Sequence, residues 1–292
     1  MIDSPIVTAA SRRHLRLDGA MATYIHDLSA ARGPAIPCDE LSLSQPARVR
    51  GVHDAYLEAG ADIVRTNTFG VTAHDRVSDA PHICRAAARL ARDAADSWSQ
   101  RTPDRPRFVA GTLGPPDGGG AHERIRAAYR APVRALLDGG VDLLLFETCF
   151  HPAQIAAALA ACVDAASDAG RAFPVLVSMV LDARGRLSVS GASIDDGLAE
   201  IDSDIVVGLG VNCGPRADGL ADVLDTLRRH AALVTCHPSA GLPDSGGRYP
   251  LGPDAFARDV GRYAADGRAD ITGGCCGTTP AHVAALARAG TQ

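Results

Sequence analysis

The stretch Ala269-Asp270-Ile271-Thr272-Gly273-Gly274-Cys275-Cys276-Gly277-Thr278-Thr279-Pro280 places two adjacent cysteines directly after a short strand-like run. Successive side chains of a regular strand point to opposite faces, so neighbouring cysteines within a strand cannot converge. The flanking glycines release this restriction, because glycine adopts backbone conformations that other residues avoid. The sequence therefore allows both sulfurs to face one point at the end of a strand.

The run at residues 270–272 is the last of eight apolar runs, which alternate with segments that carry apolar residues at helical spacing. Such alternation indicates an α/β protein with a parallel sheet. Eight repeats of the unit predict a (β/α)8 barrel, or TIM barrel, whose active site lies where the strands end. We expect one barrel domain over residues 1–292. The expected strands are residues 15–17, 62–66, 108–111, 143–146, 175–180, 205–211, 233–235 and 270–272.

The composition favours partners that are small molecules. The chain has 292 residues, a formal net charge of -5 and 4% aromatic residues, so nothing indicates a nucleic-acid-binding face. No apolar run approaches the roughly 20 residues that a membrane helix needs. The sequence begins without a basic segment and apolar core, so we expect no secretory signal and a cytoplasmic location. In the cytoplasm, eight cysteines are more often used for metal binding or catalysis than for disulfides.

A third cysteine follows another expected strand. Cys213 comes two positions after the run at residues 205–211 and is itself followed by glycine. Because barrel strands end at one face, Cys213 is able to meet Cys275 and Cys276 there. Three protein ligands with an open fourth position are typical of catalytic zinc sites. The alternative is that cysteines are buried small hydrophobic residues, which is our interpretation of the following four. They are Cys84, Cys149, Cys162 and Cys236.

Two carboxylates also stand at strand ends. Asp18 follows the run at residues 15–17, and Glu147 follows the run at residues 143–146. Carboxylates in such places face desolvation unless they meet a cation or hydrogen-bond donors, and a substrate ammonium group would satisfy both. The alternatives are that Asp18 caps the next helix and that Glu147 pairs with a neighbouring arginine.

With these motifs in order along nearly the whole chain, the sequence resembles the homocysteine S-methyltransferase family. Members of that family are zinc-dependent (β/α)8 barrels, and cytosolic members methylate homocysteine to methionine. Their methyl donors differ by branch: S-methylmethionine or S-adenosylmethionine, glycine betaine, or methylcobalamin in larger modular enzymes. The resemblance is carried by Asp18-Gly19-Ala20-Met21 and by residues 60–69, 139–148, 208–213, 240–243 and 273–280.

The resemblance implies that Cys213, Cys275 and Cys276 hold zinc and that the sulfur of homocysteine takes the open fourth position. A free alkyl thiol is mostly protonated near neutral pH, whereas the thiolate is the nucleophile. Zinc binds the sulfur as thiolate and so supplies the reactive form. The three cysteines are therefore the expected catalytic residues, acting through the metal.

The resemblance also implies which residues bind the substrate. The two carboxylates would hold the amino group of homocysteine, and backbone N–H groups around Ala20 and Met21 would receive its carboxylate. Asn212 would help to shape the pocket. The implied substrate-binding residues are Asp18, Gly19, Ala20, Met21, Glu147 and Asn212.

Several residues near the expected mouth, the face where the barrel strands end, depart from the family's pattern: Ala22, Arg65, His151, His237 and Ser239. Arg65 stands where an acidic residue is often found, and it would either contact an anionic donor or pair with a carboxylate. His237 stands where an aromatic residue is usual, and His151 where an acidic residue often occurs. Either histidine could line the donor side, but a histidine at a strand end is more often a hydrogen-bonded structural residue.

Three functions fit these observations. The first is a methyltransferase that takes methyl from a small onium donor, and it is favoured because the sequence ends a dozen residues after Pro280, without a folate-binding or cobalamin-binding module. The second is a subunit that binds homocysteine and zinc and takes methyl from a separate corrinoid protein, which the segment at residues 65–69 favours. The third is a zinc hydrolase, disfavoured because hydrolytic barrels use histidine and carboxylate ligands. The oligomeric state stays open and allows a homo-oligomer.

Overall fold

Eight parallel strands form the centre of the molecule in the computed structural model, which describes residues 4–27, 37–73, 79–117, 122–170, 172–201, 204–214 and 219–290. Their order in the sheet is β1-β8-β7-β6-β5-β4-β3-β2, and every neighbouring pair is parallel. The strands are β1 (Leu15–Arg16), β2 (Ile63–Arg65), β3 (Phe108–Leu113), β4 (Leu143–Cys149), β5 (Val175–Met179), β6 (Val206–Cys213), β7 (Leu233–Pro238) and β8 (Ile271–Thr272).

The sheet closes into a barrel between β1 and β2. Leu17 forms a parallel bridge with Ile63, and the N–H of Asp18 donates to the Ile63 carbonyl at 2.9 Å. The N–H of Asp62 donates to the Arg16 carbonyl at 2.7 Å on the same seam. These bonds join the two ends of the strand order, so the predicted (β/α)8 barrel is confirmed.

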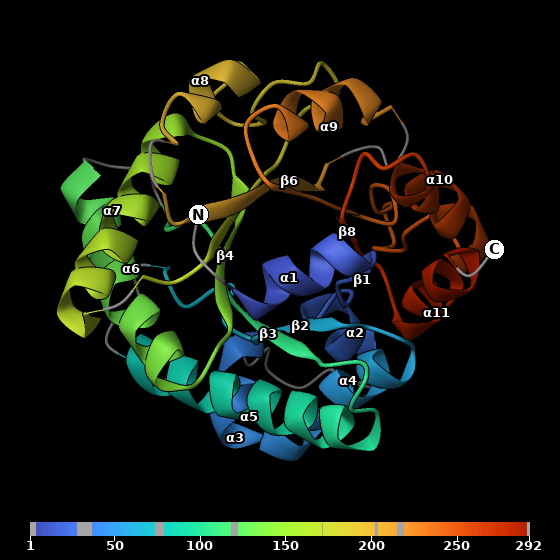
Figure 1. The fold of residues 1–292 in the computed structure, drawn as a ribbon, viewed down its shortest axis with the longest axis horizontal. Coiled ribbons are helices and arrows are strands. Elements are labelled where there is room, and N and C mark those ends of the chain that lie inside the picture. The colour runs from blue at the N-terminus through green and yellow to red at the C-terminus, as the bar shows by residue number, and fades with distance from the viewer. Residues whose placement is uncertain are drawn as a thin grey trace.

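Helices surround the barrel (Figure 1). Buried apolar side chains of these helices pack against those of the strands. Among the residues described, no helix is long and apolar enough to span a membrane. The helices are α1 (Pro5–Arg12), α2 (Ala22–Asp27), the 3-10 turn η1 (Cys38–Glu40), α3 (Leu41–Ser44), α4 (Pro46–Glu58), α5 (Ala80–Arg101), α6 (His122–Asp138), α7 (Pro152–Ala169), α8 (Ile194–Leu198), α9 (Ala221–Arg228), α10 (Pro253–Ala265) and α11 (Pro280–Ala289).

The first helix closes the amino end of the barrel. Ile6 and Ala10 of α1 are buried in one cluster with residues that open several strands, among them Leu15, Phe108 and Leu143. Figure 1 shows α1 inside the ring of outer helices. Because α1 covers the end where the strands begin, the other end is left for a binding site.

Several strands run further than their apolar stretches predict. β4 extends from the expected residue 146 to Cys149, β6 extends from residue 211 to Cys213, and β7 extends from residue 235 to Pro238. The added residues include polar ones, and a polar residue after an apolar run resembles the start of a loop, so the sequence pattern predicts shorter strands. Side chains at the mouth are consequently held by the sheet.

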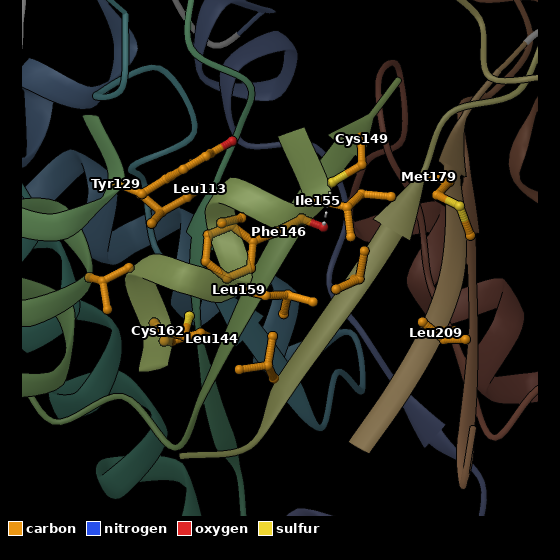
Figure 2. Close-up of a cluster of buried hydrophobic side chains, with 14 of the residues drawn as sticks. Leu113, Tyr129, Leu144, Phe146, Cys149, Ile155, Leu159, Cys162, Met179 and Leu209 are labelled. Carbon is orange, nitrogen blue, oxygen red and sulfur yellow. Dashed lines mark hydrogen bonds between the residues drawn. The ribbon is translucent and has the colours of Figure 1, made fainter. Parts of the chain in front are cut away.

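A buried cluster between the barrel and helices α6 and α7 contains two of the remaining cysteines, Cys149 and Cys162 (Figure 2). The rings of Tyr129 and Phe146 meet there edge to face, with centroids 5.2 Å apart. Burial raises the pKa of both thiols above its ordinary value, which keeps them protonated. Their interpretation as packing residues is confirmed, and it extends to Cys84 and Cys236 in the same cluster.

The carboxylate of Asp62 links three arginines at the amino end of the barrel. Asp62 is fully buried at the start of β2, and it accepts the backbone N–H of Arg16 at 2.9 Å. The guanidinium groups of Arg13 and Arg105 contact the same carboxylate at 2.9 and 2.7 Å. Although burial opposes its charge, Arg105 and the other arginines hold the pKa of Asp62 below its usual value.

We expect Asp62→Ala to lower the free energy of unfolding by about 3 kcal/mol, because removal of one partner from a buried ion network leaves the others unpaired. Urea denaturation followed by circular dichroism measures this change. Asp168→Ala is the control, since Asp168 pairs with the exposed Arg134, and it should change the free energy by less than about 1 kcal/mol. Equal losses in the two variants would contradict a special role for Asp62.

Candidate metal centre and substrate site

Three cysteine sulfurs converge at the carboxyl end of the barrel. Cys213 is the last residue of β6, while Cys275 and Cys276 lie in the loop after β8. The Sγ of Cys213 lies 2.7 Å from that of Cys275 and 4.0 Å from that of Cys276, and the latter two sulfurs are 4.0 Å apart. In the described part of the chain, this is the group of three ligand side chains close enough to hold one metal ion.

The geometry and chemistry of these sulfurs fit zinc. A tetrahedral site with zinc–sulfur bonds of about 2.3 Å places its sulfurs roughly 3.8 Å apart, which two of the three separations approach. The third separation is shorter, but it exceeds the about 2.05 Å of a disulfide, and all three cysteines are free. Thiolates are also the soft ligands that zinc accepts.

The close approach of the sulfurs makes their charges interdependent. Hydrogen bonds from Cys213 and Cys275 lower the pKa of Cys276 to about 3, because they stabilise its thiolate. Hydrogen bonding to Cys213 and Cys276 raises the pKa of Cys275, because there it favours the protonated thiol. Three thiolates at these distances repel one another, and a cation among them would remove that repulsion.

Unusual backbone conformations aim the ends of β4 and β6 into the mouth. Thr148 and Cys213 are the non-glycine residues with positive φ in the described chain, at 61° and 54°. Such conformations cost of order 1–3 kcal/mol each and persist only where their surroundings hold them. Gly214 follows Cys213 with φ of 76°, so the chain turns sharply after the sulfur.

Asn212 holds both strained residues. Its Oδ1 accepts the N–H of Thr148 at 2.9 Å and the hydroxyl of Ser178 at 2.8 Å. Its Nδ2 donates to Thr148 Oγ1 at 2.9 Å and lies 3.4 Å from the Sγ of Cys213. One amide therefore links β4, β5 and β6 directly behind the sulfur cluster, whereas the sequence had suggested only a role in shaping the pocket.

The glycines beside the cysteines serve close packing. A Cβ at Gly273 would lie 2.8 Å from the Leu17 carbonyl, and a Cβ at Gly274 would collide with the side chain of Thr278. The Thr278 hydroxyl donates to the Cys275 carbonyl at 2.7 Å, which closes the loop over the sulfurs. Atoms of Leu17 and Thr278 occupy the space beside these glycines.

Asp18 and Glu147 meet at the mouth, and one arginine joins them. The Nε of Arg65 lies 2.7 Å from Asp18 Oδ1, and its Nη1 lies 2.6 Å from Glu147 Oε1. The backbone N–H of Arg65 also donates to Asp18 Oδ2 at 2.9 Å. The alternative that Glu147 pairs with an arginine is therefore confirmed. The alternative that Arg65 pairs with a carboxylate is confirmed as well, for both Asp18 and Glu147.

Unequal partners give the two carboxylates different pKa values. Burial raises the pKa of Asp18 to about 6, although Arg65 opposes the shift. Burial acts on Glu147 in the same direction, but Arg65 and His237 together lower its pKa to about 2. Glu147 is therefore firmly charged, and the Arg65–Glu147 pair is the stronger ion pair of the network.

The two histidines differ in their surroundings. His237 is buried on β7, and its Nε2 lies 3.0 Å from Glu147 Oε1. Burial lowers the pKa of His237 despite that carboxylate, so the neutral ring donates to Glu147. His151 caps α7, where its Nδ1 accepts the N–H of Ala153, and this is the structural role weighed from the sequence.

The Ala20 segment contributes to the site differently from the sequence-based expectation. The N–H of Ala20 donates to the Thr278 hydroxyl at 3.1 Å, and the Tyr56 hydroxyl donates to the Ala20 carbonyl at 2.7 Å. The Ala20 N–H is thus engaged within the protein. Binding of a carboxylate by the backbone near Met21 stays a prediction.

A cavity of about 370 Å³ lies over these groups and is of a size that suits a small molecule. The expected residues Asp18, Ala20, Met21 and Glu147 line it, as do the three cysteines. Residues at the ends of the second and third strands also line it, as expected for strand ends that face one crevice: Thr66, Asn67, Thr68, Phe69 and Thr112. Sequence reasoning missed Pro37, Cys38 and Asp39, because these wall residues follow no expected strand.

Two further residues contact the sulfur cluster, of which Tyr249 was not singled out from the sequence. Tyr249 and Ser239 form hydrogen bonds that favour the thiolate of Cys276. Tyr249 also packs over Gly277, whose φ of 76° turns the chain after the cysteines. In the sequence, the glycine after Cys276 was the signal for this turn. Nothing in the sequence indicated that the ring of Tyr249 would cover it.

Comparison with known proteins gives curated relatives and solved structures. The chain is 34% identical to the methionine synthase of Mycobacterium leprae over 98% of its own length and 33% identical to that of Mycobacterium tuberculosis over 99%. It spans only 25% and 26% of those relatives. The metallated structure of the homocysteine methyltransferase MmuM from Escherichia coli superposes with a TM-score of 0.78 at 27% identity and covers 98% of this chain and 100% of that one.

The oxidised structure of the same Escherichia coli protein superposes with a TM-score of 0.79 at 26% identity, over 98% of this chain and 99% of that one. The sequence profile of one family, described as homocysteine S-methyltransferase, matches residues 15–290. That match includes every strand of the barrel and all three cysteines of the cluster. The chain therefore belongs to the homocysteine S-methyltransferase family.

Proposed function

We propose that the protein is a zinc-dependent S-methyltransferase that moves a methyl group from a small onium donor to a small thiol. Homocysteine, with methionine as product, is the acceptor that family membership favours. The observation that carries the proposal is the convergence of Cys213, Cys275 and Cys276 in one cavity with the Asp18–Glu147 pair. The donors in question are S-methylmethionine, S-adenosylmethionine and glycine betaine.

The protein's own residues supply a rigid setting for this reaction. When bound by the cysteines, zinc keeps an acceptor sulfur in its nucleophilic thiolate form near neutral pH. Asn212 holds Cys213 in its strained conformation, and the loop around Thr278 fixes Cys275. Such positioning matters because methyl transfer needs the donor carbon in line with the sulfur.

The walls of the cavity suit a methylated cation. Asp39 is buried in the wall and provides a carboxylate, and Phe69 presents an aromatic ring in the same cavity. Onium groups are attracted both to carboxylates and to the faces of aromatic rings. Asp39 lies in η1 and Phe69 follows β2, both line the cavity that the three cysteines also line, and we assign them to the donor.

A second candidate is a subunit that takes its methyl group from a separate corrinoid protein. The observation that favours it is the 34% identity to a methionine synthase, of which this chain matches a quarter. A zinc hydrolase is disfavoured, because a ligand set of three sulfurs differs from the histidines and carboxylates usual in hydrolytic sites.

Substitution of any cluster cysteine should abolish tight zinc binding. We expect Cys213→Ser, Cys275→Ser and Cys276→Ser each to weaken zinc binding by more than the roughly 10–100-fold that loss of an outer-shell partner costs. Zinc content after dialysis and competition with a chelator measure the effect. Cys162→Ala, which alters a packing cysteine of α7, should bind zinc like the unaltered protein. Retention of tight zinc by all three serine variants would refute the assignment.

A panel of donors separates the two candidate functions. We expect the zinc-loaded protein to methylate an acceptor thiol from at least one sulfonium or betaine donor without any corrinoid, because the cavity suits a small cation. Mass spectrometry of the thioether product measures this, with homocysteine as the reference acceptor. Product formed only from a methylated corrinoid protein would eliminate the onium proposal and support the subunit.

Phe69→Leu should weaken donor binding selectively. The ring is 47% exposed, so we expect little loss of stability, and the donor KM should rise by about 2–5-fold, as for loss of an exposed cation–π contact. Initial rates at saturating acceptor measure this KM. Leu242→Ala, at another exposed apolar residue, serves as the control and should leave the donor KM unchanged. An unaltered KM in Phe69→Leu would remove the ring from the donor site.

A further inference from the structure

The two carboxylates of the cavity already hold a cation that belongs to the protein. Arg65 contacts Asp18 through Nε at 2.7 Å and Glu147 through Nη1 at 2.6 Å. Its guanidinium group therefore occupies the space between the two acids. This is the place where an acceptor's α-ammonium group would have to lie in order to contact both.

Arg65 is held there from several sides. Its Nη2 donates to the carbonyls of Gly19 at 2.7 Å and of Gly274 at 2.6 Å, in the loops after β1 and β8. The side chain is only 8% exposed, and it leaves β2 on the inward face. A guanidinium with this many charge-assisted bonds is part of the site's framework, and a substrate cation would have to break several of them to displace it.

Little hydrogen-bonding capacity is left for a second cation. Both oxygens of Asp18 accept from Arg65, and Glu147 Oε1 accepts from Arg65 and from His237. Among the described residues, this leaves Glu147 Oε2 as the one oxygen of the two carboxylates without a hydrogen bond. The nearest carbonyls are likewise engaged by Nη2. A desolvated ammonium group has three N–H donors that need acceptors, and a donor left without one weakens binding.

The polar wall beside Arg65 is neutral and internally bonded. The hydroxyls of Thr66 and Thr68 lie 2.6 Å apart, and Thr68 donates to the Thr112 carbonyl at 2.6 Å. The N–H of Thr112 donates back to the Thr66 hydroxyl at 3.0 Å. This wall gives shape to the cavity near the carboxylates but adds no anion for an ammonium group.

We propose that Arg65 takes the place of an acceptor ammonium group, so that this site prefers small thiols without an α-ammonium group over homocysteine. The inference rests on the proposed methyltransferase function and specifies its acceptor. The class is that of small alkanethiols, with mercapto-carboxylic acids among them. In 4-mercaptobutyrate the skeleton of homocysteine is kept and only the amino group is absent, which makes it the matched probe.

Binding of the two thiols to the zinc-loaded full chain tests the preference. Isothermal titration calorimetry gives both dissociation constants, and we expect 4-mercaptobutyrate to bind at least about tenfold more tightly, because homocysteine would bury donors without acceptors. The ratio of kcat/KM values with a common donor should follow the same order. Tighter binding of homocysteine would overturn this inference and leave the methyltransferase proposal standing. Binding of both thiols without methylation from any donor would overturn the methyltransferase proposal, while the ratio of constants still decides the acceptor.

Substitution of Arg65 should reverse the preference. Arg65→Gln frees the two carboxylates for an ammonium group, so we expect the affinity ratio to shift by about tenfold or more toward homocysteine. Arg65→Lys retains a cation and should shift the ratio less. Arg134→Gln, which removes a 58% exposed arginine from its pair with Asp168, is the matched control and should leave the ratio unchanged.

Circular dichroism and zinc content establish that each variant is folded and loaded. An unchanged ratio in folded Arg65→Gln would refute the role of Arg65. Should that variant not fold, the ratio measured on the unaltered protein decides the question by itself, since it requires no substitution.

Discussion

The guanidinium group of Arg65 is the interaction on which the arrangement of the mouth depends. It joins the end of β1 through Asp18, the end of β4 through Glu147 and the cysteine loop through the Gly274 carbonyl. Desolvation makes buried ion pairs costly, and they repay that cost only when geometry and hydrogen bonding are complete. Here the donors of Arg65 meet both carboxylates and two loop carbonyls, which meets that condition. The loop that carries Cys275 and Cys276 therefore shares one framework with the carboxylates.

Asn212 imposes a second constraint on the opposite side of the sulfurs. Thr148 and Cys213 adopt left-handed conformations that favour glycine, and the Asn212 side chain bonds to both of them. Strain of this kind is found where a site must hold a side chain in one direction. On β4, Glu147 precedes the strained Thr148, so the same bend sets the carboxylate and the sulfur relative to each other.

Much of the fold and the cysteine cluster could be predicted from the sequence, because both depend on local patterns. Eight apolar runs that alternate with helical segments predicted the strands. The glycines around Cys275 and Cys276 indicated a turn at which two sulfurs converge. Pairing across the barrel was not predictable in the same way. His237 and Glu147 are 90 positions apart, and only the closed sheet brings them within 3.0 Å. The strand ends were also set too short, since a polar side chain that faces a barrel interior looks like the start of a loop.

Strand periodicity places the Arg65 side chain inside the barrel. Ile63 of β2 belongs to the cluster inside the barrel, whereas Val64 packs with the outer helices, so alternation places Arg65 inside again. A charge on the inward face of a strand needs a buried counter-charge, and Asp18 and Glu147 were the acids expected at the same mouth. The sequence thus contained the parts of the network, but it did not show that the protein would satisfy the acids by itself.

A built-in cation changes what the site can recognise. In a cavity with two unpaired acids, much of the selectivity for an amino acid would come from its ammonium group. With Arg65 in place, the two acids are organised before any ligand arrives, and an acceptor gains less from an ammonium group placed beside them. Recognition of the acceptor then depends on its sulfur and on its fit to the threonine wall of the cavity. The cysteines that suit zinc and the arginine between the acids thus point to the same simple requirement, which is a small molecule with a free thiol.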